Sequence, residues 1–403
     1  MTERIVIVGA GQAGSELAAA LRAGGFAGSL TLLGAEDAPP YQRPPLSKKY
    51  LLGEMSAERL WLHDPAFYRD QSITLRTGAR VAAIDRSARR VLLADGEALP
   101  YDRLALTTGA KPRALPAAIG GALPGVHGVR ALSDVDAMAP AFRPGARALI
   151  VGGGYIGLEA AAVAARLGLH VTLIEAAPRI LGRVACAETA AWFRALHAGR
   201  GVTIREGTAL ARLEGDPRVA RAVLADGETL EIDLAIVGIG VDPETALAAQ
   251  AGLTLDNGIA VDAGCATSDP AIFAAGDCAS FPWRGRRIRL ESVQNAIDQA
   301  KAAAAAMLGA PVAYDPTPWF WSDQCDVKLQ IAGLNAGYDR VIERPGARAS
   351  AHSVWYFRGA ALLAVDAMND ARAYMTAKRW LEAGVSPDPA RIADAGFDLK
   401  GLT

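Results

Sequence analysis

Cysteine is scarce in this sequence, with four residues in a chain of 403, at positions 186, 265, 278 and 325. No two of them stand at CxxC or CxxxxC spacing, which argues against a zinc site and against a redox-active disulfide. We therefore expect four reduced thiols, most of them buried. The five histidines include no HxxxH pair that would place two imidazoles on one helix face. The sequence thus predicts no metal site.

An excess of charge of one sign is also missing, because 42 Lys and Arg residues stand against 43 Asp and Glu residues. A net charge of −1 gives no general attraction to nucleic acid or to an anionic membrane. No uninterrupted apolar run reaches the roughly 20 residues that a membrane span needs. A first strand that begins at about Arg4 leaves no room for a signal peptide. We expect a cytoplasmic protein without a nucleic-acid or membrane partner.

A glycine-rich motif stands at the start of the chain, which is 51% hydrophobic and long enough for two or three domains. An apolar strand over residues 5–8 precedes Gly9, Gly11 and Gly14 at GxGxxG spacing, and an alanine-rich helix follows. The first glycine of such a motif permits a tight turn, the second lets a pyrophosphate approach the backbone, and the third lets helix and strand pack closely. The pattern predicts a dinucleotide site.

The surroundings of this motif support the same prediction. The helix offers the N–H groups of its first turn to phosphates. A second strand over residues 29–33 leads to Glu36, at about the distance where an acid binds the adenosine ribose.

The same pattern recurs in the middle of the chain, between a strand that ends at Val151 and a helix that extends to about Leu167. The residues of this second motif are Gly152, Gly154, Tyr155, Ile156 and Gly157. The next strand, over residues 170–174, leads to Glu175, where a carboxylate accepts hydrogen bonds from the ribose 2′-OH and repels a 2′-phosphate. The sequence therefore favours NADH over NADPH. Arg179 nearby could reverse this choice, and Glu175 could instead be a solvated charge at the end of a strand.

A shorter motif, GD at Gly276 and Asp277, follows a buried strand over residues 271–274. Glycine lets the chain approach a ligand, and an aspartate at the carboxyl end of a strand can accept a hydrogen bond from a sugar or ribitol hydroxyl. The pair alone means little, but after two dinucleotide motifs it indicates nucleotide binding.

Together these motifs resemble the flavoproteins with two dinucleotide domains, and specifically the NADH-dependent ferredoxin reductases that serve bacterial haem monooxygenases and aromatic-ring dioxygenases. The matching stretches, spread over residues 9–324, are GAGQAG, YQRPPLSKKYL, TTGAKPR, GGGYIGLE, VGIGVDPE, FAAGDCA, ESVQNA and PWFWSDQ. The resemblance implies an α/β fold of glutathione-reductase-like architecture, with two Rossmann-like dinucleotide-binding domains and a C-terminal α+β domain. The implied domains are an FAD-binding domain over 1–113 and 242–318, an NADH-binding domain over 114–241, and a C-terminal domain over 319–403.

The resemblance also implies which residues bind FAD. Within the stretch PPYQRPPLSKKYL, Arg43 would contact the pyrophosphate, Pro44 and Pro45 would wall the flavin, and Lys48 would approach flavin N5. Proline lowers the entropy lost on ordering such a loop, although the stretch alone could be a rigid surface turn. Further FAD contacts would be Thr107, Gly109, Lys111, Arg130, Asp277, Val293, Gln294, Asn295 and Trp321.

An alternative stays open for two of the predicted FAD contacts, the flavin cover and the ligand of the adenosine ribose. Trp321, together with Trp319, could be a core residue instead of a cover for the flavin. Family members usually carry an acid at the position of Ala35, one residue before Glu36, which leaves the ligand of the adenosine ribose open.

The resemblance implies that Glu159 faces the nicotinamide and pairs with Lys48 across the two dinucleotide domains, which makes these two residues the catalytic pair. Such an ion pair would hold the nicotinamide over the flavin and place a cation where the hydride arrives. Arg183 and Gly240 would contact NADH. From its position alone, Glu159 could be an acid in the first turn of a helix, favoured by the helix dipole.

Two electron carriers in one chain imply hydride transfer from NADH to FAD, after which two electrons must leave. Disulfide reductases of the superfamily use a cysteine pair near the start of the chain, and its peroxidases and oxidases use one cysteine, whereas the first cysteine here is Cys186. We therefore expect an FAD-dependent NADH:ferredoxin oxidoreductase that passes single electrons to a [2Fe-2S] ferredoxin, which supplies a haem monooxygenase or a ring-hydroxylating dioxygenase.

The partner is expected to be an acidic ferredoxin that docks near the flavin edge, and the enzyme is expected to be a monomer. Candidate contacts are Arg284, Arg286, Arg287 and Arg289, and also Lys328 in the C-terminal domain. We expect that domain to contain several strands and one helix over about 370–383. An NADH-linked reductase of a quinone, a rubredoxin or a small-molecule acceptor is the alternative function. A redox-sensing flavoprotein similar to apoptosis-inducing factor is a more distant alternative, because its long insertions are missing here.

Overall fold

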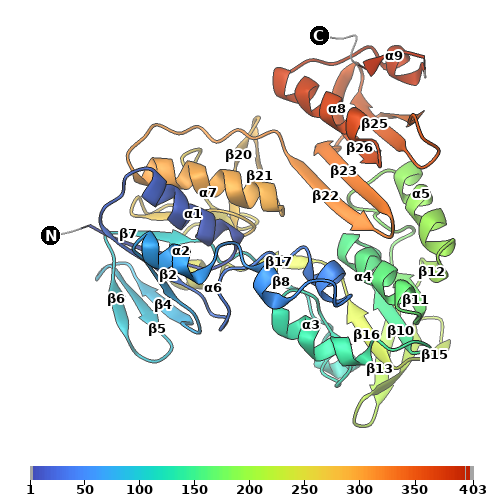
Figure 1. Cartoon of the computed structure of the whole chain (residues 1–403), viewed down its shortest axis with the longest axis horizontal. Coiled ribbons are helices and arrows are strands. Elements are labelled where there is room, and N and C mark those ends of the chain that lie inside the picture. The colour runs from blue at the N-terminus through green and yellow to red at the C-terminus, as the bar shows by residue number, and fades with distance from the viewer. Residues whose placement is uncertain (1–2, 395, 400–403) are drawn as a thin grey trace. The chain divides into compact units, whose positions relative to one another are not determined.

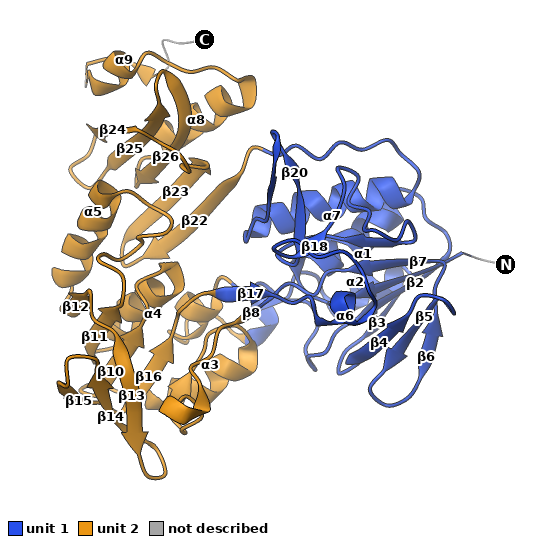
Figure 2. Ribbon diagram, turned by 180° about the vertical axis from the view of Figure 1, so that it is seen from behind, with its two compact units in different colours: residues 1–43, 57–111, 241–316 blue, residues 44–56, 112–240, 317–403 orange. Residues whose placement is uncertain are grey.

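The computed structural model describes residues 3–394 and 396–399 (Figure 1). Contacts within the chain divide it into two compact units, which Figure 2 shows in separate colours. Unit 1 comprises residues 1–43, 57–111 and 241–316, and unit 2 comprises residues 44–56, 112–240 and 317–403. Each unit is therefore built from segments that are far apart in the sequence.

The unit boundaries at 111, 240 and 316 lie within two residues of the predicted domain boundaries at 113, 241 and 318. Residues 44–56, expected in the FAD-binding domain, belong to unit 2 by their contacts. The expected NADH-binding and C-terminal domains share unit 2. The division into three functional domains stays a prediction.

A parallel sheet with helices packed against it forms the centre of unit 1. Its strands and helices are β1 (Arg4–Val8), α1 (Gln12–Ala23), β2 (Ser29–Leu33), α2 (Pro65–Asp70), β3 (Ile73–Arg76), β7 (Arg103–Leu106), β19 (Ile272–Ala274) and α7 (Val293–Met307). The strand order is β19-β7-β1-β2-β3, and every pairing is parallel. Apolar strands such as RIVIV suit a sheet that is covered on its faces by helices.

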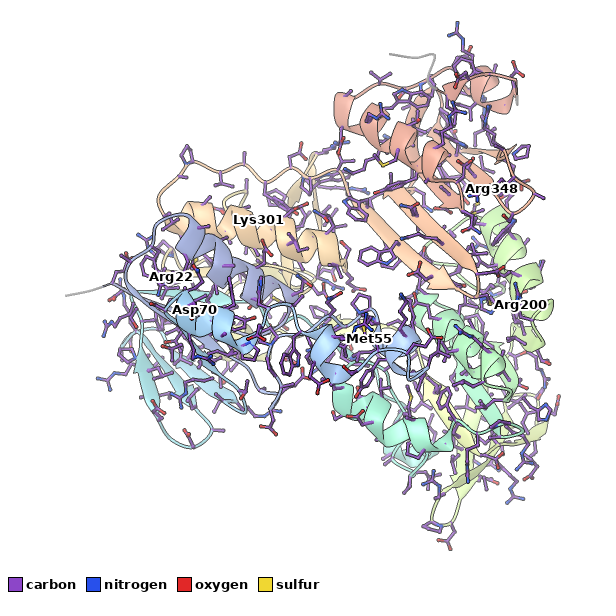
Figure 3. The ribbon with its side chains drawn as sticks, in the orientation of Figure 1. Arg22, Met55, Asp70, Arg200, Lys301 and Arg348 are labelled. Atoms are coloured by element: carbon purple, nitrogen blue, oxygen red, sulfur yellow. The ribbon has the colours of Figure 1, made fainter. Side chains whose placement is uncertain are left out.

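Helices α1 and α7 lie side by side against this sheet (Figure 1). Their facing sides are rich in alanine, whose small side chains let two helices approach closely. At the edge of this contact, Lys301 Nζ of α7 lies 3.3 Å from Glu16 Oε1 of α1 (Lys301 is labelled in Figure 3).

Smaller elements complete unit 1, and one of them, β8, extends by one residue into unit 2. They are β4 (Val81–Asp85), β5 (Arg90–Leu93), β6 (Ala98–Pro100), β8 (Ala110–Pro112), β17 (Val241–Pro243), α6 (Ala246–Gln250), β18 (Ile259–Ala260), β20 (Ala279–Trp283) and β21 (Arg286–Ile288). Strands β4, β5 and β6 form an antiparallel sheet, β8 pairs with β17, and β20 joins β18 and β21.

A second parallel sheet lies in unit 2 and repeats the arrangement of the first. Its elements and their neighbours are β9 (Val126–His127), α3 (Leu132–Met138), β10 (Arg147–Val151), α4 (Tyr155–Arg166), β11 (His170–Glu175), α5 (Ala187–Ala198), β12 (Val202–Glu206) and β16 (Leu234–Val237). The strand order is β12-β11-β10-β16-β9. An antiparallel sheet of β13 (Leu210–Gly215), β14 (Val219–Leu224) and β15 (Thr229–Glu231) packs near it.

The C-terminal part of unit 2 is an antiparallel sheet covered by a helix. Its elements are β22 (Trp319–Gln324), β23 (Val327–Gly333), β24 (Arg340–Pro345), β25 (His352–Arg358), β26 (Ala361–Met368), α8 (Ala371–Ala383) and α9 (Pro389–Ala393). The order is β22-β23-β26-β25-β24, and α8 packs on β23 and β26. Across the part of the chain that the structure describes, no helix has the length and apolar composition of a membrane span.

Candidate active site

The first glycine motif forms a turn between β1 and α1 whose geometry explains all three glycines. Gly9 has a φ of +113°, and a Cβ there would lie 2.3 Å from the Thr107 carbonyl oxygen. A Cβ on Gly14 would lie 1.9 Å from the Gly9 carbonyl oxygen. A Cβ on Gly11 would meet no atom within 4 Å, so the backbone at the start of α1 is open to a ligand. This fits a dinucleotide pyrophosphate at a helix N-terminus.

The second motif, between β10 and α4, repeats this geometry. Gly152 has a φ of +106°, and a Cβ on it would lie 2.4 Å from the Gly238 carbonyl oxygen. A Cβ on Gly157 would lie 2.1 Å from the Gly152 carbonyl oxygen, whereas one on Gly154 would meet nothing within 4 Å. The chain therefore contains two cradles of the same kind, one in each unit.

The acid that follows each cradle is held in place by hydrogen bonds. At the end of β11, Glu175 Oε2 accepts from the Gly153 N–H and Oε1 from the Ala177 N–H, both at 2.7 Å. The carboxylate thus lies beside the second cradle and keeps free lone pairs for a ribose hydroxyl. Arg179, which could have favoured NADPH, donates from Nη1 to the Ala185 carbonyl oxygen at 2.8 Å.

In unit 1, the structure brings Glu36 and Arg43 together. Arg43 Nη2 lies 2.5 Å from Glu36 Oε1, and the Tyr41 hydroxyl donates to Glu36 Oε2 at 2.5 Å. Burial alone would lower the pKa of Arg43, but Tyr41 and the charges of Glu36 and Asp277 raise it above its ordinary value. Two predicted FAD ligands are therefore in contact, and Asp277 is near enough to act on one of them.

Other predicted FAD residues of unit 1 surround the first cradle. Thr107 Oγ1 donates to the Gly9 carbonyl oxygen at 2.8 Å, and a Cβ on Gly276 would lie 3.0 Å from the Ala13 Cβ. Val293 and Gln294 are the first two residues of α7.

Three further predicted FAD residues of unit 1 are held by neighbouring groups. The Gly109 carbonyl oxygen accepts from the Glu244 N–H, and Lys111 Nζ lies 3.6 Å from Glu244 Oε2. The Asn295 side chain is buried and accepts from the Tyr314 hydroxyl at 3.0 Å.

Other residues that we expected to contact FAD lie in unit 2, namely Pro44, Pro45, Arg130 and Trp321. Trp321 is partly buried on β22, with its ring centroid 5.8 Å from that of Trp319. The Arg130 N–H donates to Asp134 Oδ2 at 2.9 Å, at the start of α3. The two tryptophan rings thus contact each other, and the expected place of Trp321 at the flavin stays a prediction.

Lys48 and Glu159 form an ion pair inside unit 2. Lys48 lies in a short irregular helix, η1 (Leu46–Tyr50), that packs on α4, and its φ and ψ of −132° and −108° are not helical. Lys48 Nζ lies 2.9 Å from Glu159 Oε1, with 16% and 7% of the two side chains exposed. The pair was expected to join two domains, but the contacts of residues 44–56 place both partners in one compact unit.

Two hydroxyls complete the hydrogen bonds of Glu159. Ser322 Oγ donates to Oε1 at 2.7 Å, and Ser47 Oγ donates to Oε2 at 2.9 Å. Burial raises the pKa of Glu159, while Lys48, Ser322 and Ser47 favour its ionised form and oppose that rise. The arrangement is a buried carboxylate held in one orientation by three donors.

Sequence reasoning missed both serines. Ser322 is next to Trp321 in PWFWSDQ, and Ser47 is next to Lys48 in LSKK. The available signal was the strand period of two, which places Phe320, Ser322 and Gln324 on one face of β22. Two polar residues on a face that is buried indicate a hydrogen-bonded site.

The predicted NADH contacts Arg183 and Gly240 are close together. A Cβ on Gly240, whose φ is +106°, would lie 3.2 Å from Arg183 Nη2. At the start of α4, the Tyr155 ring packs on Phe320 with 4.8 Å between centroids, and Ile156 is an exposed apolar side chain. A cation and an exposed apolar surface therefore lie in the unit that holds the second cradle.

The thiols are isolated from one another. All four are free, with Cys186, Cys265 and Cys278 buried and Cys325 exposed, so most of the thiols are buried as expected. Burial raises the pKa of Cys265 to about 12, so this thiol stays protonated at neutral pH. Within residues 3–394 and 396–399, no three His, Cys, Asp or Glu side chains gather as metal ligands would.

Comparison with known proteins agrees with the two dinucleotide cradles and the separate C-terminal sheet. A family model described as pyridine nucleotide-disulphide oxidoreductase matches residues 3–300, and one described as reductase C-terminal matches residues 319–403. Putidaredoxin reductase of Pseudomonas putida is 42% identical over 407 residues, covering 99% of this chain and 96% of that protein. The ferredoxin–NAD(+) reductase component of the anthranilate 1,2-dioxygenase system of Burkholderia cepacia is 42% identical over 405 residues, covering 98% of each.

Solved structures agree. The crystal structure of the covalent putidaredoxin reductase–putidaredoxin complex matches with a TM-score of 0.95 and 41% identity, covering 99% of this chain and 97% of that one. The predicted α/β fold and the predicted resemblance are therefore confirmed. The chain belongs to the pyridine nucleotide-disulphide oxidoreductase family, and within it to the FAD- and NAD(H)-dependent ferredoxin reductases that carry a reductase C-terminal domain.

Proposed function

We propose that this enzyme takes hydride from NADH onto FAD and delivers single electrons to a [2Fe-2S] ferredoxin, which supplies a haem monooxygenase or a ring-hydroxylating dioxygenase. The observation that carries the proposal is the pair of glycine cradles with open backbone at Gly11 and Gly154. Two dinucleotide cradles in one chain serve transfer between two carriers. The division of labour would follow the expected FAD-binding, NADH-binding and C-terminal domains.

The first cradle would hold the pyrophosphate of FAD, with the Arg43 guanidinium beside it and Asp277 as an acceptor for a ribitol hydroxyl. FAD, when bound, supplies an acceptor for hydride and a donor of single electrons. Thr107 supports the turn at Gly9 and so fixes the backbone N–H groups of the cradle. Tyr41 and Glu36 hold Arg43, and Glu36 is also our candidate ligand for the adenosine ribose.

The second cradle would hold NADH, with Glu175 as acceptor for the ribose hydroxyls and Arg183 near the phosphates. Arg179 is bound to the loop backbone, which supports the preference for NADH over NADPH. Glu159 would face the nicotinamide, with Lys48 presenting its ammonium on the same side. Hydride transfer to a flavin needs no nucleophile or general base from the protein, so the role of this buried pair would be to orient the reacting ring.

The partner ferredoxin is proposed to be acidic and to dock by charge near the flavin edge. Arg284 and Arg286 are exposed and lie over the Trp283 ring. Arg287 and Arg289 each donate from Nη1 to a backbone carbonyl oxygen and so have fewer donors left for a partner. A monomer in the cytoplasm, where NADH and reduced thiols coexist, is the proposed working form.

The acceptor is tested by steady-state reduction of cytochrome c with NADH, with and without an acidic [2Fe-2S] ferredoxin. The proposal predicts that turnover requires the ferredoxin. Turnover that does not depend on the ferredoxin would contradict the proposal, and would indicate a reductase of a quinone, a rubredoxin or a small-molecule acceptor.

A further inference from the structure

A row of buried polar side chains starts at Glu159 and continues through unit 2. Ser322 Oγ on β22 donates to Glu159 Oε1 at 2.7 Å, and Gln324 Nε2 donates to Ser322 Oγ at 3.2 Å. Gln324 Oε1 lies 2.9 Å from Nε2 of His197 on α5. Ser322, Gln324 and His197 are each 0% exposed. We call these three residues the Glu159 chain.

The hydrogen bonds of the Glu159 chain all run in one direction, with each side chain donating to its neighbour on the side of Glu159. Ser322 accepts the amide proton of Gln324, so its own proton is left for the carboxylate. Gln324 Oε1 is an acceptor, so His197 Nε2 must carry a proton. Burial lowers the pKa of His197 and favours the neutral ring. The His197 Nδ1 atom is buried without a hydrogen-bond partner among the described residues, as suits an unprotonated nitrogen.

The positions of the three residues in their elements explain why they meet. Ser322 and Gln324 are two residues apart and so point to one face of β22. Thr189, Phe193 and His197 are four residues apart along α5 and lie on its buried side. Buried polar groups need hydrogen-bond partners within the protein, and these three side chains supply one another with partners in a row that ends on the Glu159 carboxylate.

We propose that Ser322, Gln324 and His197 are positioning residues for hydride transfer, which aim the Ser322 hydroxyl at Glu159 and thereby keep this carboxylate paired with Lys48. The inference rests on the proposed function, because aligning Glu159 matters only if the Lys48–Glu159 pair orients the nicotinamide. Without the Ser322 proton, the carboxylate would keep two donors out of three and could turn away from Lys48.

The test is anaerobic rapid mixing of the FAD-loaded enzyme with a series of NADH concentrations, which separates the limiting rate of flavin reduction from the Kd for NADH. We expect Ser322→Ala, which removes a hydrogen bond to the charged Glu159, to lower the limiting rate by about tenfold or more. His197→Leu removes a hydrogen bond to the neutral Gln324 and should lower the rate by about 2- to 10-fold. The Kd should change by less than about twofold. His197→Gln, which keeps an N–H donor near the position of Nε2, should restore most of the rate.

A matched control comes from the same sheet. Ser353 on β25 is 0% exposed, and its hydroxyl accepts from Trp355 Nε1 at 3.0 Å, so it is a buried serine outside the Glu159 chain. Ser353→Ala should lower the melting temperature as Ser322→Ala does, but should leave the limiting rate unchanged. A purely structural role for Ser322 would move both variants alike.

A double-mutant cycle with Glu159→Gln separates this inference from the proposed function. If Ser322 acts through Glu159, Ser322→Ala should add little slowing in the Glu159→Gln background. The inference is overturned if Glu159→Gln slows reduction while Ser322→Ala and His197→Leu react at the wild-type rate, or if Ser322→Ala slows both backgrounds equally. A wild-type rate for Glu159→Gln itself would overturn the proposed role of the ion pair. Should His197→Leu fail to fold, Ser322→Ala alone decides.

Discussion

At the scale of single residues, Lys48 is the side chain that we expect to contribute most to hydride transfer, because its ammonium lies 2.9 Å from the largely buried carboxylate of Glu159. Removal of one partner of such a pair leaves the other charge uncompensated. We expect Lys48→Met to lower the limiting rate of flavin reduction by NADH on the order of tenfold or more. Lys49→Met, at the neighbouring lysine, is the control. Reduction of the Lys48→Met enzyme at the wild-type rate would remove Lys48 from the mechanism.

Glu175 is the residue that should set the choice of nucleotide. Its carboxylate is fixed beside the second cradle by the N–H groups of Gly153 and Ala177, where it would repel a 2′-phosphate. Glu175→Ala should lower the ratio of kcat/KM for NADH to that for NADPH by about tenfold or more, through weaker use of NADH and better use of NADPH. Glu231→Ala, at an exposed strand end, should keep the ratio. An unaltered ratio in Glu175→Ala would refute the assignment.

At the scale of elements, regular patterns were predictable and irregular ones were not. The strand over 29–33 and the helix predicted over about 370–383 are confirmed, because apolar runs, glycine turns and helix caps are local signals. The stretch around Lys48 was expected as a stiff loop, whereas it contains the short helix η1. Its backbone depends on packing against α4, more than 100 residues away, which no local pattern encodes.

The contact between α5 and the C-terminal sheet contains a second buried acid, Asp366 on β26. Thr189 Oγ1 donates to Asp366 Oδ2 at 2.8 Å, and the Tyr356 hydroxyl donates to the same oxygen. Burial raises the pKa of Asp366 from 3.8 to about 6 in spite of these donors. Beyond the C-terminal end of α5, Arg200 Nη2 pairs with Asp326 Oδ1 at 2.6 Å (Arg200 is labelled in Figure 3).

This raised pKa predicts how stability depends on pH. Between its unfolded pKa and about 6, the folded protein binds more protons at Asp366 than the unfolded protein, so this group's stabilisation is lost as pH rises through that window. The loss is about 3 kcal/mol. Urea unfolding from pH 4 to pH 7 should show Asp366→Asn gaining stability relative to the wild type as pH rises. Parallel pH profiles for the two proteins would contradict the prediction.

At the scale of the whole molecule, the two nucleotide cradles and the order of the segments could be predicted, because each cradle is a contiguous glycine motif with a strand before it and a helix after it. The residues predicted around them came from resemblance to a family. The roles of Ser322 and His197 were not predicted, because they depend on contacts between residues far apart in the sequence. Ser322 and Glu159 are 163 residues apart, and His197 and Gln324 are 127 residues apart. Membership of unit 2 for residues 44–56 likewise depends on tertiary packing.

Docking of an acidic ferredoxin should depend on salt. We expect its rate of reduction, at low ferredoxin concentration, to fall as ionic strength rises. Replacing Arg284 and Arg286 together by alanine should lower that rate by about threefold or more at low salt. Replacing Arg212 and Arg221, which pair with Glu214, changes the charge equally and is the control. A rate of ferredoxin reduction that does not change with ionic strength would argue against docking by charge.

The central claim is that NADH reduces an FAD held by this chain, and rapid anaerobic mixing of the FAD-loaded enzyme with NADH or NADPH tests it most directly. The account predicts that the flavin absorbance bleaches quickly with NADH, and that NADPH needs a higher concentration to reach the same rate. An enzyme that holds FAD and is not bleached by NADH would contradict the account at the second cradle.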